Sequence, residues 1–289
     1  MTGETQPIFI VGCGRSGTTL LYEMLARHRD LAWFSTWTDR SRRPELAVFN
    51  RLFKRGRHST LYGPRPSEGY RLWDAALAFP PAPGEASLGR QHATPTVAGR
   101  VARLIDRHQR FGGGSTFVNK NTRNSRRVPF LHALYPNARF IHVLRFPLDT
   151  VASVLEAEWW GELPLWWRDG AAPRSLRDGP LDEVRLAAEL WVREVSAVID
   201  ASDRLGPDQY TEVRYEDLVS SPVAIVTELL AWLELEHGPG APAALVRGVS
   251  KRSVGIHERR LSPDQARVAS ALVAELADGL GYPLSRTSE

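Results

Sequence analysis

The chain has 289 residues, of which 43% are hydrophobic, and this content excludes a disordered chain because it allows a large buried core. The formal net charge of +4 suits a polyanionic ligand. Nucleic acid would also fit this charge, but no ribonucleoprotein motif, zinc-ligand spacing or repeat accompanies it, so we expect no nucleic-acid partner.

The single cysteine and the first residues bear on cellular location. Cys13 has no partner for an intramolecular disulfide, which favours a reducing compartment. The start MTGETQPIFIVG lacks the basic residues and long apolar core of a signal peptide, and no run of about 18 apolar residues could span a bilayer. We therefore expect a cytoplasmic protein without a transmembrane segment. The sequence leaves a peripheral membrane contact and the oligomeric state open.

Short β-rich runs alternate with helical patterns along the chain, which predicts an α/β fold with a central, mostly parallel sheet flanked by helices in three layers. The expected strands are 7–11, 31–35, 116–119, 139–145 and 210–215. The expected helices are 17–28, 97–109, 126–134, 148–157, 181–204, 222–233 and 264–278. Residues 40–95 are rich in Pro, Gly and Arg and predict an insertion with short helices, within one domain over 1–289.

The segment PIFIVGCGRSGTTLLYEML, residues 7–25, reads as a buried strand, a glycine-rich turn and a helix start. Such a turn presents the free N–H groups of a helix N-terminus to an anion. Gly12 and Gly17 have nearly the P-loop spacing, but Thr18 stands where that motif has lysine, and Arg15 offers a planar fork of donors instead. This pattern predicts a phosphate or sulfate site; the plainer alternative is a turn that only lets strand and helix pack closely.

The sequence GxxRSGTTLL in this segment resembles the 5′-phosphosulfate loop of sulfotransferases that use 3′-phosphoadenosine 5′-phosphosulfate (PAPS). In FIHVLRFPLDTVASVL, residues 140–155, Arg145 at a strand end and Ser153 eight residues later are similar to the family's 3′-phosphate motif. RYEDLVSSPVAIVTELLAWLEL, residues 214–235, resembles its Tyr-Glu-Asp-Leu segment and closing helix. The three segments occur in the family's order, so the resemblance covers most of the chain.

The resemblance implies PAPS as co-substrate, adenosine 3′,5′-bisphosphate as product and no metal. The residues that it implies for donor binding are Gly14, Arg15, Ser16, Gly17, Thr18, Thr19, Arg145, Ser153 and Tyr215. Tyr215 could equally pack in the core. From a late loop, the resemblance adds Lys251, Arg252 and Ser253, with Arg259 and Arg260 as alternatives.

Catalytic residues are expected at three places. Arg15 and Lys120, which follows the pattern of a family lysine that contacts the sulfuryl group, would supply positive charge. Ser35 and Thr36 stand where the similar branch of the family has a glutamate base. Asp39 is our first substitute for that base and His92 the second, because a carboxylate in a partly apolar cleft or an ordinary imidazole can titrate near neutrality; Glu68 is a more distant candidate.

Four tryptophans gather in EWWGELPLWWRDGAAP, within a loop-like region around 158–180. Trp159-Trp160 and Trp166-Trp167 do not follow a helical stripe, and they favour a lid or an apolar wall for an acceptor. Alternatively they seal the loop onto the core or form a dimer contact.

Together these features predict transfer of a sulfuryl group from PAPS to a hydroxyl of a small molecule, glycan or lipid. The insertion around 40–95 is then expected on the acceptor side. The alternatives are a P-loop kinase or nucleotide hydrolase, with Asp149 as its best magnesium ligand, and a catalytically silent nucleotide-binding relative.

Overall fold

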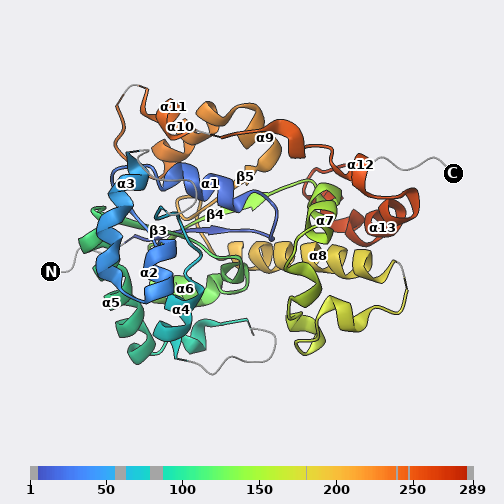
Figure 1. Cartoon of the computed structure of the whole chain (residues 1–289), viewed down its shortest axis with the longest axis horizontal. Helices are drawn as coiled ribbons and strands as arrows, with labels where there is room; N and C mark the ends of the chain where they lie inside the picture. The colour runs from blue at the N-terminus through green and yellow to red at the C-terminus, as the bar shows by residue number, and fades with distance from the viewer. Residues whose placement is uncertain are drawn as a thin grey trace.

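The computed structural model describes residues 6–55, 63–78, 87–179, 181–238, 240–246 and 248–284. Five strands form one sheet in the order β2-β3-β1-β4-β5, and all the pairings between them are parallel (Figure 1). The strands are β1 (Ile8–Val11), β2 (Leu31–Ala32), β3 (Thr116–Lys120), β4 (Arg139–Leu144) and β5 (Tyr210–Arg214). The α/β prediction with a mostly parallel sheet is confirmed.

Three of the expected strands end earlier than the sequence pattern suggested, the one expected over 139–145 by a single residue, at Leu144. The second was expected over 31–35 but stops at Ala32, because Ser35 caps helix α2 (Thr36–Ser41) through a reciprocal capping box with Thr38. The fifth was expected to reach 215, but Tyr215 already begins helix α9 (Tyr215–Ser220). Ser35 thus belongs to the cap of α2, whereas Tyr215 lies at the site described below.

Alternate residues of β1 enter two different cores. Ile8 and Ile10 pack with α1 (Thr18–Leu25) and α10 (Pro222–Trp232), whereas Phe9 and Val11 pack with α4 (Tyr70–Leu77), α5 (Pro95–Gly112) and α6 (Val128–Leu134). This follows from the period of two along a strand. The sheet is therefore covered on both faces, as three layers require (Figure 1).

A third core lies beyond the β4 side of the sheet. It joins α7 (Pro147–Leu155), α8 (Asp182–Ser202) and α13 (Pro263–Gly279). With α1, α5, α6 and α10, these helices correspond to the seven that the sequence predicted. Figure 1 shows α8 running beside α7 and α13.

The remaining elements are short. The described part of 40–95 contains the end of α2, α3 (Asn50–Lys54), α4 and two 3₁₀ turns, η1 (Pro44–Phe49) and η2 (Arg90–His92); residues 56–62 and 79–86 of that predicted insertion lie outside the described residues. The tryptophan-rich region forms three 3₁₀ turns, η4 (Trp160–Glu162), η5 (Trp166–Arg168) and η6 (Pro173–Leu176). Four further short elements complete the set among the described residues: η3 (Thr122–Arg126), α11 (Ala241–Leu245), η7 (Lys251–Ser253) and α12 (His257–Arg260).

The order of the strands places the site. Strand β1 lies between β3 and β4. The chain leaves β1 toward β2 at one edge of the sheet, and after β3 it crosses to β4 on the other side of β1, so these connections leave the carboxyl ends of the strands in opposite directions. Open parallel sheets bind ligands in the crevice at such a point. The turn after β1, Lys120 at the end of β3 and Arg145 just after β4 all lie at this edge.

Candidate active site

The turn after β1 has a backbone shape that depends on two glycines. Gly12 has φ +142°, and a Cβ there would lie 2.5 Å from the carbonyl oxygen of Val143. Gly17 has φ +96°, and a Cβ there would overlap the ring of Tyr215. Arg15 also has a positive φ, +71°, which is uncommon for a residue with a side chain and typical of functional turns. The sequence motif therefore marks a specific loop geometry rather than a simple packing turn.

The residues of the predicted 3′-phosphate motif meet this loop. Arg15 donates from Nε to Ser153 Oγ at 3.0 Å, and Arg145 donates from Nη1 to the carbonyl oxygen of Arg15 at 2.8 Å. A second donor of Arg145 reaches the carbonyl of Ser253 in the late loop. Three segments that are far apart in the sequence are thus joined around one arginine.

Arg145 retains a donor for a ligand. Its Nε is buried and has no hydrogen-bond partner among the described residues. Burial lowers the pKa of Arg145, and Arg15 acts in the same direction, while Asp149, Tyr215 and Glu216 oppose the shift. An arginine remains charged despite such a shift, so the site holds a buried cation with an unused donor.

The Tyr-Glu-Asp segment contacts Arg145 and the turn that carries it. The ring of Tyr215 lies 4.7 Å from the guanidinium carbon of Arg145, a cation–π contact. Glu216 accepts a hydrogen bond at 2.8 Å from the backbone N–H of Phe146, and another at 3.2 Å from the hydroxyl of Tyr282. Glu216 therefore fixes the turn that carries Arg145, a structural role that the sequence motif did not reveal.

Asp149 fastens the late loop. Its carboxylate accepts hydrogen bonds from the backbone N–H groups of Gly255 at 2.8 Å and His257 at 3.0 Å, and Nδ1 of His257 lies 2.6 Å away. The carboxylate that would serve a kinase as magnesium ligand is thus engaged by the protein. In the ranges that the structure describes, no cluster of three or more His, Cys, Asp or Glu side chains could hold a metal ion.

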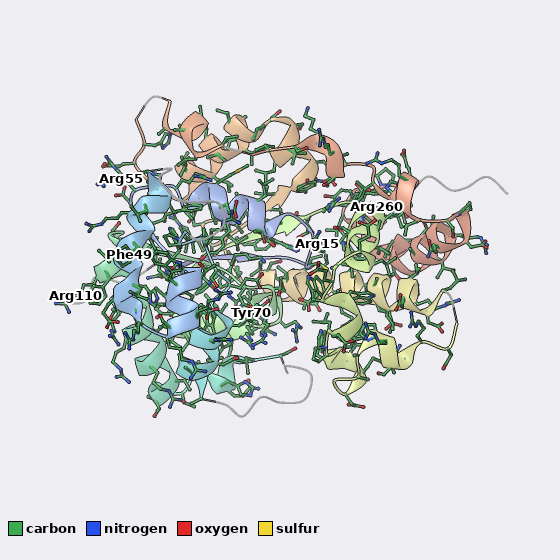
Figure 2. All side chains as sticks on the ribbon, in the orientation of Figure 1. Arg15, Phe49, Arg55, Tyr70, Arg110 and Arg260 are labelled. Carbon is green, nitrogen blue, oxygen red and sulfur yellow. The ribbon has the colours of Figure 1, made fainter. Side chains whose placement is uncertain are left out.

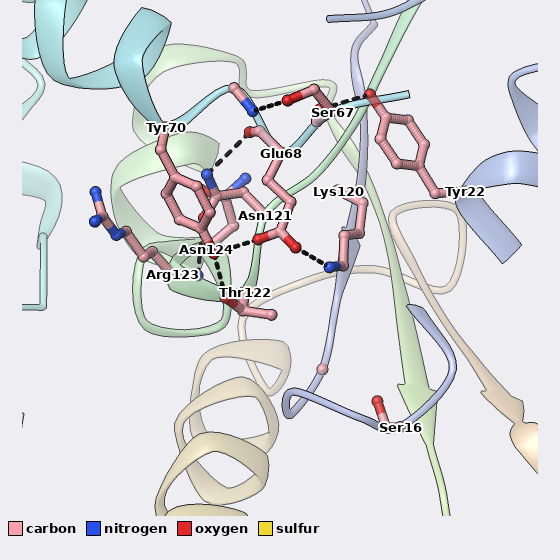
Figure 3. A network of polar contacts seen from close by, with 12 residues as sticks. Ser16, Tyr22, Ser67, Glu68, Tyr70, Lys120, Asn121, Thr122, Arg123 and Asn124 are labelled. Carbon is pink, nitrogen blue, oxygen red and sulfur yellow. Dashed lines mark hydrogen bonds and ion pairs between the residues drawn. The ribbon is translucent and has the colours of Figure 1, made fainter. Parts of the chain in front are cut away.

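A charged network occupies the β3 side of the site. Lys120 forms an ion pair with the carboxylate of Glu68, which also accepts a hydrogen bond from the hydroxyl of Tyr70. That hydroxyl lies 2.9 Å from Oγ1 of Thr122, and the amide of Asn121 donates to the backbone carbonyl of Glu68 at 3.0 Å. Figure 3 shows the Glu68 carboxylate between Lys120 and Tyr70.

Glu68 carries a shifted pKa. Burial acts to raise the pKa of Glu68, but Lys120, together with Tyr70 and the backbone of Thr122, outweighs it, so the pKa lies below its usual value. Glu68 is therefore ionised at neutral pH and able to accept a proton.

The two base candidates favoured by the sequence lie elsewhere. Asp39 accepts hydrogen bonds from the backbone N–H groups of Arg71 at 3.0 Å and Leu72 at 3.2 Å, so its carboxylate stabilises the first turn of α4. His92 accepts from the backbone N–H of Gly89 at 3.0 Å, within the turn η2. Neither side chain lines the cavity that Arg15 and Lys120 share.

That cavity has a volume of about 720 Å³. We call one part the donor half, after the donor site that the sequence predicts there; its lining residues are Gly14, Arg15, Gly17, Thr18, Thr19, Leu20, Arg145, Ser153, Tyr215, Gly248, Ser250 and Ser253. We call the other part the acceptor half, after the acceptor side that the sequence predicts for the tryptophan-rich loop; its lining residues are Glu68, Tyr70, Lys120, Thr122, Arg123, Arg126, Trp159, Leu163, Pro164, Trp166, Trp167, Leu190 and Glu194. Figure 2 shows Arg15 and Tyr70, one from each half, in the central part of the molecule.

The predicted donor residues are mostly at the cavity. Ser16 is the exception within the phosphate loop: its hydroxyl donates to the carbonyl of Cys13 at 2.7 Å and helps to close the turn. In the late loop Ser253 lines the cavity, whereas Lys251 and Arg252 are exposed and lie outside its lining. The exposed pair would act on a ligand by charge at longer range.

The tryptophan-rich segment is divided between core and cavity. Trp160 and Leu165 are buried in the third core, so the sealing role considered from the sequence holds for Trp160. Trp159, Trp166 and Trp167 line the cavity, and Trp159 lies over the phosphate loop, 3.6 Å from where a Cβ on Gly14 would stand. These three side chains form part of the cavity wall, and a role of that wall in binding an acceptor stays a prediction.

Comparison with known proteins decides the family. The family model described as "Sulfotransferase family" matches residues 7–239, which is more than half of the chain. The chain belongs to the sulfotransferase family. This confirms the resemblance inferred from the loop and does not favour a P-loop kinase or nucleotide hydrolase.

Two relatives of this sulfotransferase family member are similar in sequence over much of its length. Both are named omega-hydroxy-beta-dihydromenaquinone-9 sulfotransferase Stf3, from Mycobacterium bovis and Mycobacterium tuberculosis, and each is 26% identical over 257 residues. The match covers 79% of this chain but spans only 63% of the length of those relatives.

Solved structures share the fold at low sequence identity. The sulfotransferase STF9 from Mycobacterium avium superposes with a TM-score of 0.62 at 15% identity, covering 96% of this chain and 77% of that one. Mouse sulfotransferase SULT7A1, solved in complex with PAP, gives a TM-score of 0.51 at 12% identity, covering 98% and 86%. The three-layer fold of the family is thereby confirmed. Separately, no described helix is long and apolar enough to cross a membrane.

Glu68 was only a distant candidate from the sequence, although it lies in the cavity and pairs with Lys120. Glu68 lies in the irregular region 40–95, where no motif marks it. The available signal was indirect: Lys120 ends a buried strand, so its charge requires a carboxylate partner from somewhere in the chain. Glu194, in the middle of α8, was missed because a single glutamate on an amphipathic helix looks like a surface residue.

Proposed function

We propose that this chain transfers a sulfuryl group from PAPS to the hydroxyl of an acceptor and releases adenosine 3′,5′-bisphosphate. The observation that carries the proposal is that one cavity joins the phosphate loop and Arg145 to the Lys120–Glu68 pair. The PAP bound to the mouse neighbour supports a 3′-phosphoadenosine donor, and the name of the mycobacterial relatives supports a hydroxyl acceptor.

The donor half would bind PAPS mainly through charge and backbone. We assign the 5′-phosphosulfate to the loop from Gly14 to Thr19, where the N-terminus of α1 and the side chain of Arg15 present donors to an anion. We assign the 3′-phosphate to Ser153 and Arg145, whose Nε has no partner among the described residues. Ser253 would complete this end, with Lys251 and Arg252 adding positive charge from the surface.

The acceptor half would supply the base. In the proposed step the acceptor O–H gives its proton to the Glu68 carboxylate while its oxygen forms a bond to sulfur. The bond from sulfur to the bridging phosphate oxygen breaks, and its electron pair leaves with adenosine 3′,5′-bisphosphate. Glu68 replaces Asp39 and His92 in this role because it alone of the three lines the cavity.

Lys120 would serve both substrates in turn. Without a donor it pairs with Glu68 and lowers the pKa of that carboxyl. When sulfuryl oxygens share the ammonium group, its pull on Glu68 weakens, so the pKa of Glu68 moves toward the range suited to a base. Lys120 and Arg15 would then stabilise the charge that develops on the transferring group.

The remaining expectations are part of the same proposal. We propose one domain over 1–289, with the region around 40–95 and the tryptophan-rich loop around 158–180 on the acceptor side, and no nucleic-acid partner. A cytoplasmic location agrees with Cys13, which is a free and buried thiol next to the phosphate loop. The acceptor that we propose is a small molecule, glycan or lipid with a free hydroxyl.

The proposal is tested by incubating the protein with PAPS that carries a radiolabelled sulfate, a chelator of divalent metals and a panel of alcohols, phenols and sugars. We expect a labelled sulfate ester to form in equal amount to adenosine 3′,5′-bisphosphate. Phosphoryl transfer from ATP and magnesium, with no transfer from PAPS to any acceptor, would contradict it.

A further inference from the structure

The two halves of the cavity treat their positive charges differently. In the donor half, Arg15 and Arg145 bond to Ser153 and to backbone carbonyls, and within the described ranges neither forms an ion pair with a carboxylate. Two guanidinium groups that are not ion-paired to a carboxylate suit a polyanion, as PAPS would be.

In the acceptor half, each cation has a carboxylate partner. Lys120 pairs with Glu68, and Arg126 pairs with Glu194 at 2.9 Å, both side chains of the second pair being almost fully buried. A third pair joins Arg123 to Asp74 at 3.0 Å. The acceptor half therefore offers no net positive field to an anion.

The rest of this half is apolar. Its remaining surface comes chiefly from Trp159, Leu163, Pro164, Trp166, Trp167 and Leu190. The Arg126 guanidinium lies 5.0 Å from the centre of the Trp166 ring, which fixes that ring as part of the wall. Flat apolar side chains around a compensated charge network favour burial of rings or hydrocarbon chains.

We propose that the acceptor is an uncharged, apolar alcohol, either aromatic or long-chained, and not an anionic glycan. This inference rests on the proposed sulfuryl transfer and names the acceptor class for the same site. A carboxylate, sulfate or phosphate on the acceptor would lie beside Glu68 and Glu194, whose partners are already engaged, and would lose its hydration without gaining a cation.

The test uses acceptor pairs that differ only in charge: 2-naphthol with 6-hydroxy-2-naphthoate, and 1-decanol with 10-hydroxydecanoate. Binding is measured by calorimetry on the full chain saturated with adenosine 3′,5′-bisphosphate, and transfer is measured with labelled PAPS. We expect the neutral member of each pair to bind and react about tenfold better or more. Equal or better binding of the acidic member, or no binding of either, would overturn the inference.

Asp74→Asn gives the reciprocal test, because Asp74 lies outside the cavity lining and its side chain is largely exposed. Arg123 then loses this carboxylate partner, so the preference for the neutral member should fall about threefold. Asp264→Asn, which removes a comparable exposed partner from Arg267 on α13, is the matched control and should leave the preference unchanged. Glu194→Gln should shift it in the same direction as Asp74→Asn, by about tenfold.

Failures of the two proposals differ. If adenosine 3′,5′-bisphosphate does not bind, or PAPS is not used with any acceptor, the proposed function fails. If both occur but the acidic acceptors are preferred, or Asp74→Asn leaves the preference unchanged, only the acceptor class is wrong.

Discussion

The donor half and the acceptor half of one cavity are built in different ways. The donor half depends on the backbone of a single turn, with Gly12 and Gly17 in conformations closed to most residues, and on side chains at strand ends. The acceptor half depends on side chains from four separate regions, around 68–70, 120–126, 159–167 and 190–194. A short sequence motif is thus enough to specify the donor half. The acceptor half can be altered by replacing single side chains without changing the backbone of the turn.

Loss of the base should affect only the acceptor half. Glu68→Gln is expected to lower the rate of sulfuryl transfer by about 10²–10⁴-fold, because proton transfer from the acceptor hydroxyl is lost. Affinity for adenosine 3′,5′-bisphosphate should stay within about twofold, since Glu68 lies outside the donor half.

The matched control is Asp39→Asn, which removes the other carboxylate that the sequence favoured. A loss of transfer in Asp39→Asn, together with normal transfer in Glu68→Gln, would mean that Asp39 and not Glu68 is the base. Single-turnover rates measured with saturating PAPS separate these outcomes from changes in binding.

Removal of a cation should affect different constants in the two halves: the transfer rate in both halves, and the affinity for the donor only in the donor half. Arg15→Ala and Lys120→Ala should each reduce the rate by about tenfold to a few hundredfold, since a charge-assisted hydrogen bond contributes about 1.5–3 kcal/mol. Arg15→Ala should also weaken donor binding, because Arg15 joins the loop to Ser153. Arg267→Ala, on the exposed side of α13, serves as the control; normal transfer in both site variants would refute the roles given to these cations.

Gly17 tests the claim that the donor half depends on backbone shape. Gly17→Ala should lower the free energy of unfolding by about 1–3 kcal/mol and weaken nucleotide binding, because its Cβ would meet the ring of Tyr215 at a positive φ. Gly206→Ala is the matched control, since a Cβ there meets nothing within 4 Å. Urea unfolding of both variants checks this, and equal stabilities would show that the loop tolerates a side chain.

Two buried histidines, one on α5 and one on β4, should make both halves sensitive to acid together. Burial lowers the pKa of His108 on α5 to about 4 and that of His142 on β4 to about 3, from 6.5. The unfolded chain therefore binds protons first as the pH falls below about 6.5, and each histidine should remove about 1.4 kcal/mol of stability per pH unit until its folded pKa is reached.

Thermal or urea unfolding between pH 7 and pH 5 measures this slope. Relative to the unsubstituted chain, His142→Gln should reduce the slope by the contribution of one histidine. An unchanged slope in His142→Gln would mean that this histidine is not the source of the acid sensitivity.

The sequence was sufficient to predict the sheet and most of the residues that line the donor half of the cavity, because both follow local rules. Buried strand runs, the glycine turn and Arg145 at a strand end are all visible within short windows. The acceptor half was less accessible, because Glu68 and Glu194 acquire their meaning only from partners, Lys120 and Arg126, that lie more than 50 residues away in the chain. Asp39 shows the converse: near a strand end it resembled a base, but the short helix α4 uses its carboxylate as a cap.

The most direct test of the donor assignment is a calorimetric titration of the full chain with adenosine 3′,5′-bisphosphate, compared with ADP in the presence and absence of magnesium. We expect the 3′-phosphate to strengthen binding about 100-fold without any need for metal, since Arg145 and Ser153 would contribute charge-assisted hydrogen bonds to it. Preference for ADP with magnesium, or binding of neither nucleotide, would contradict the assignment of this cavity to PAPS.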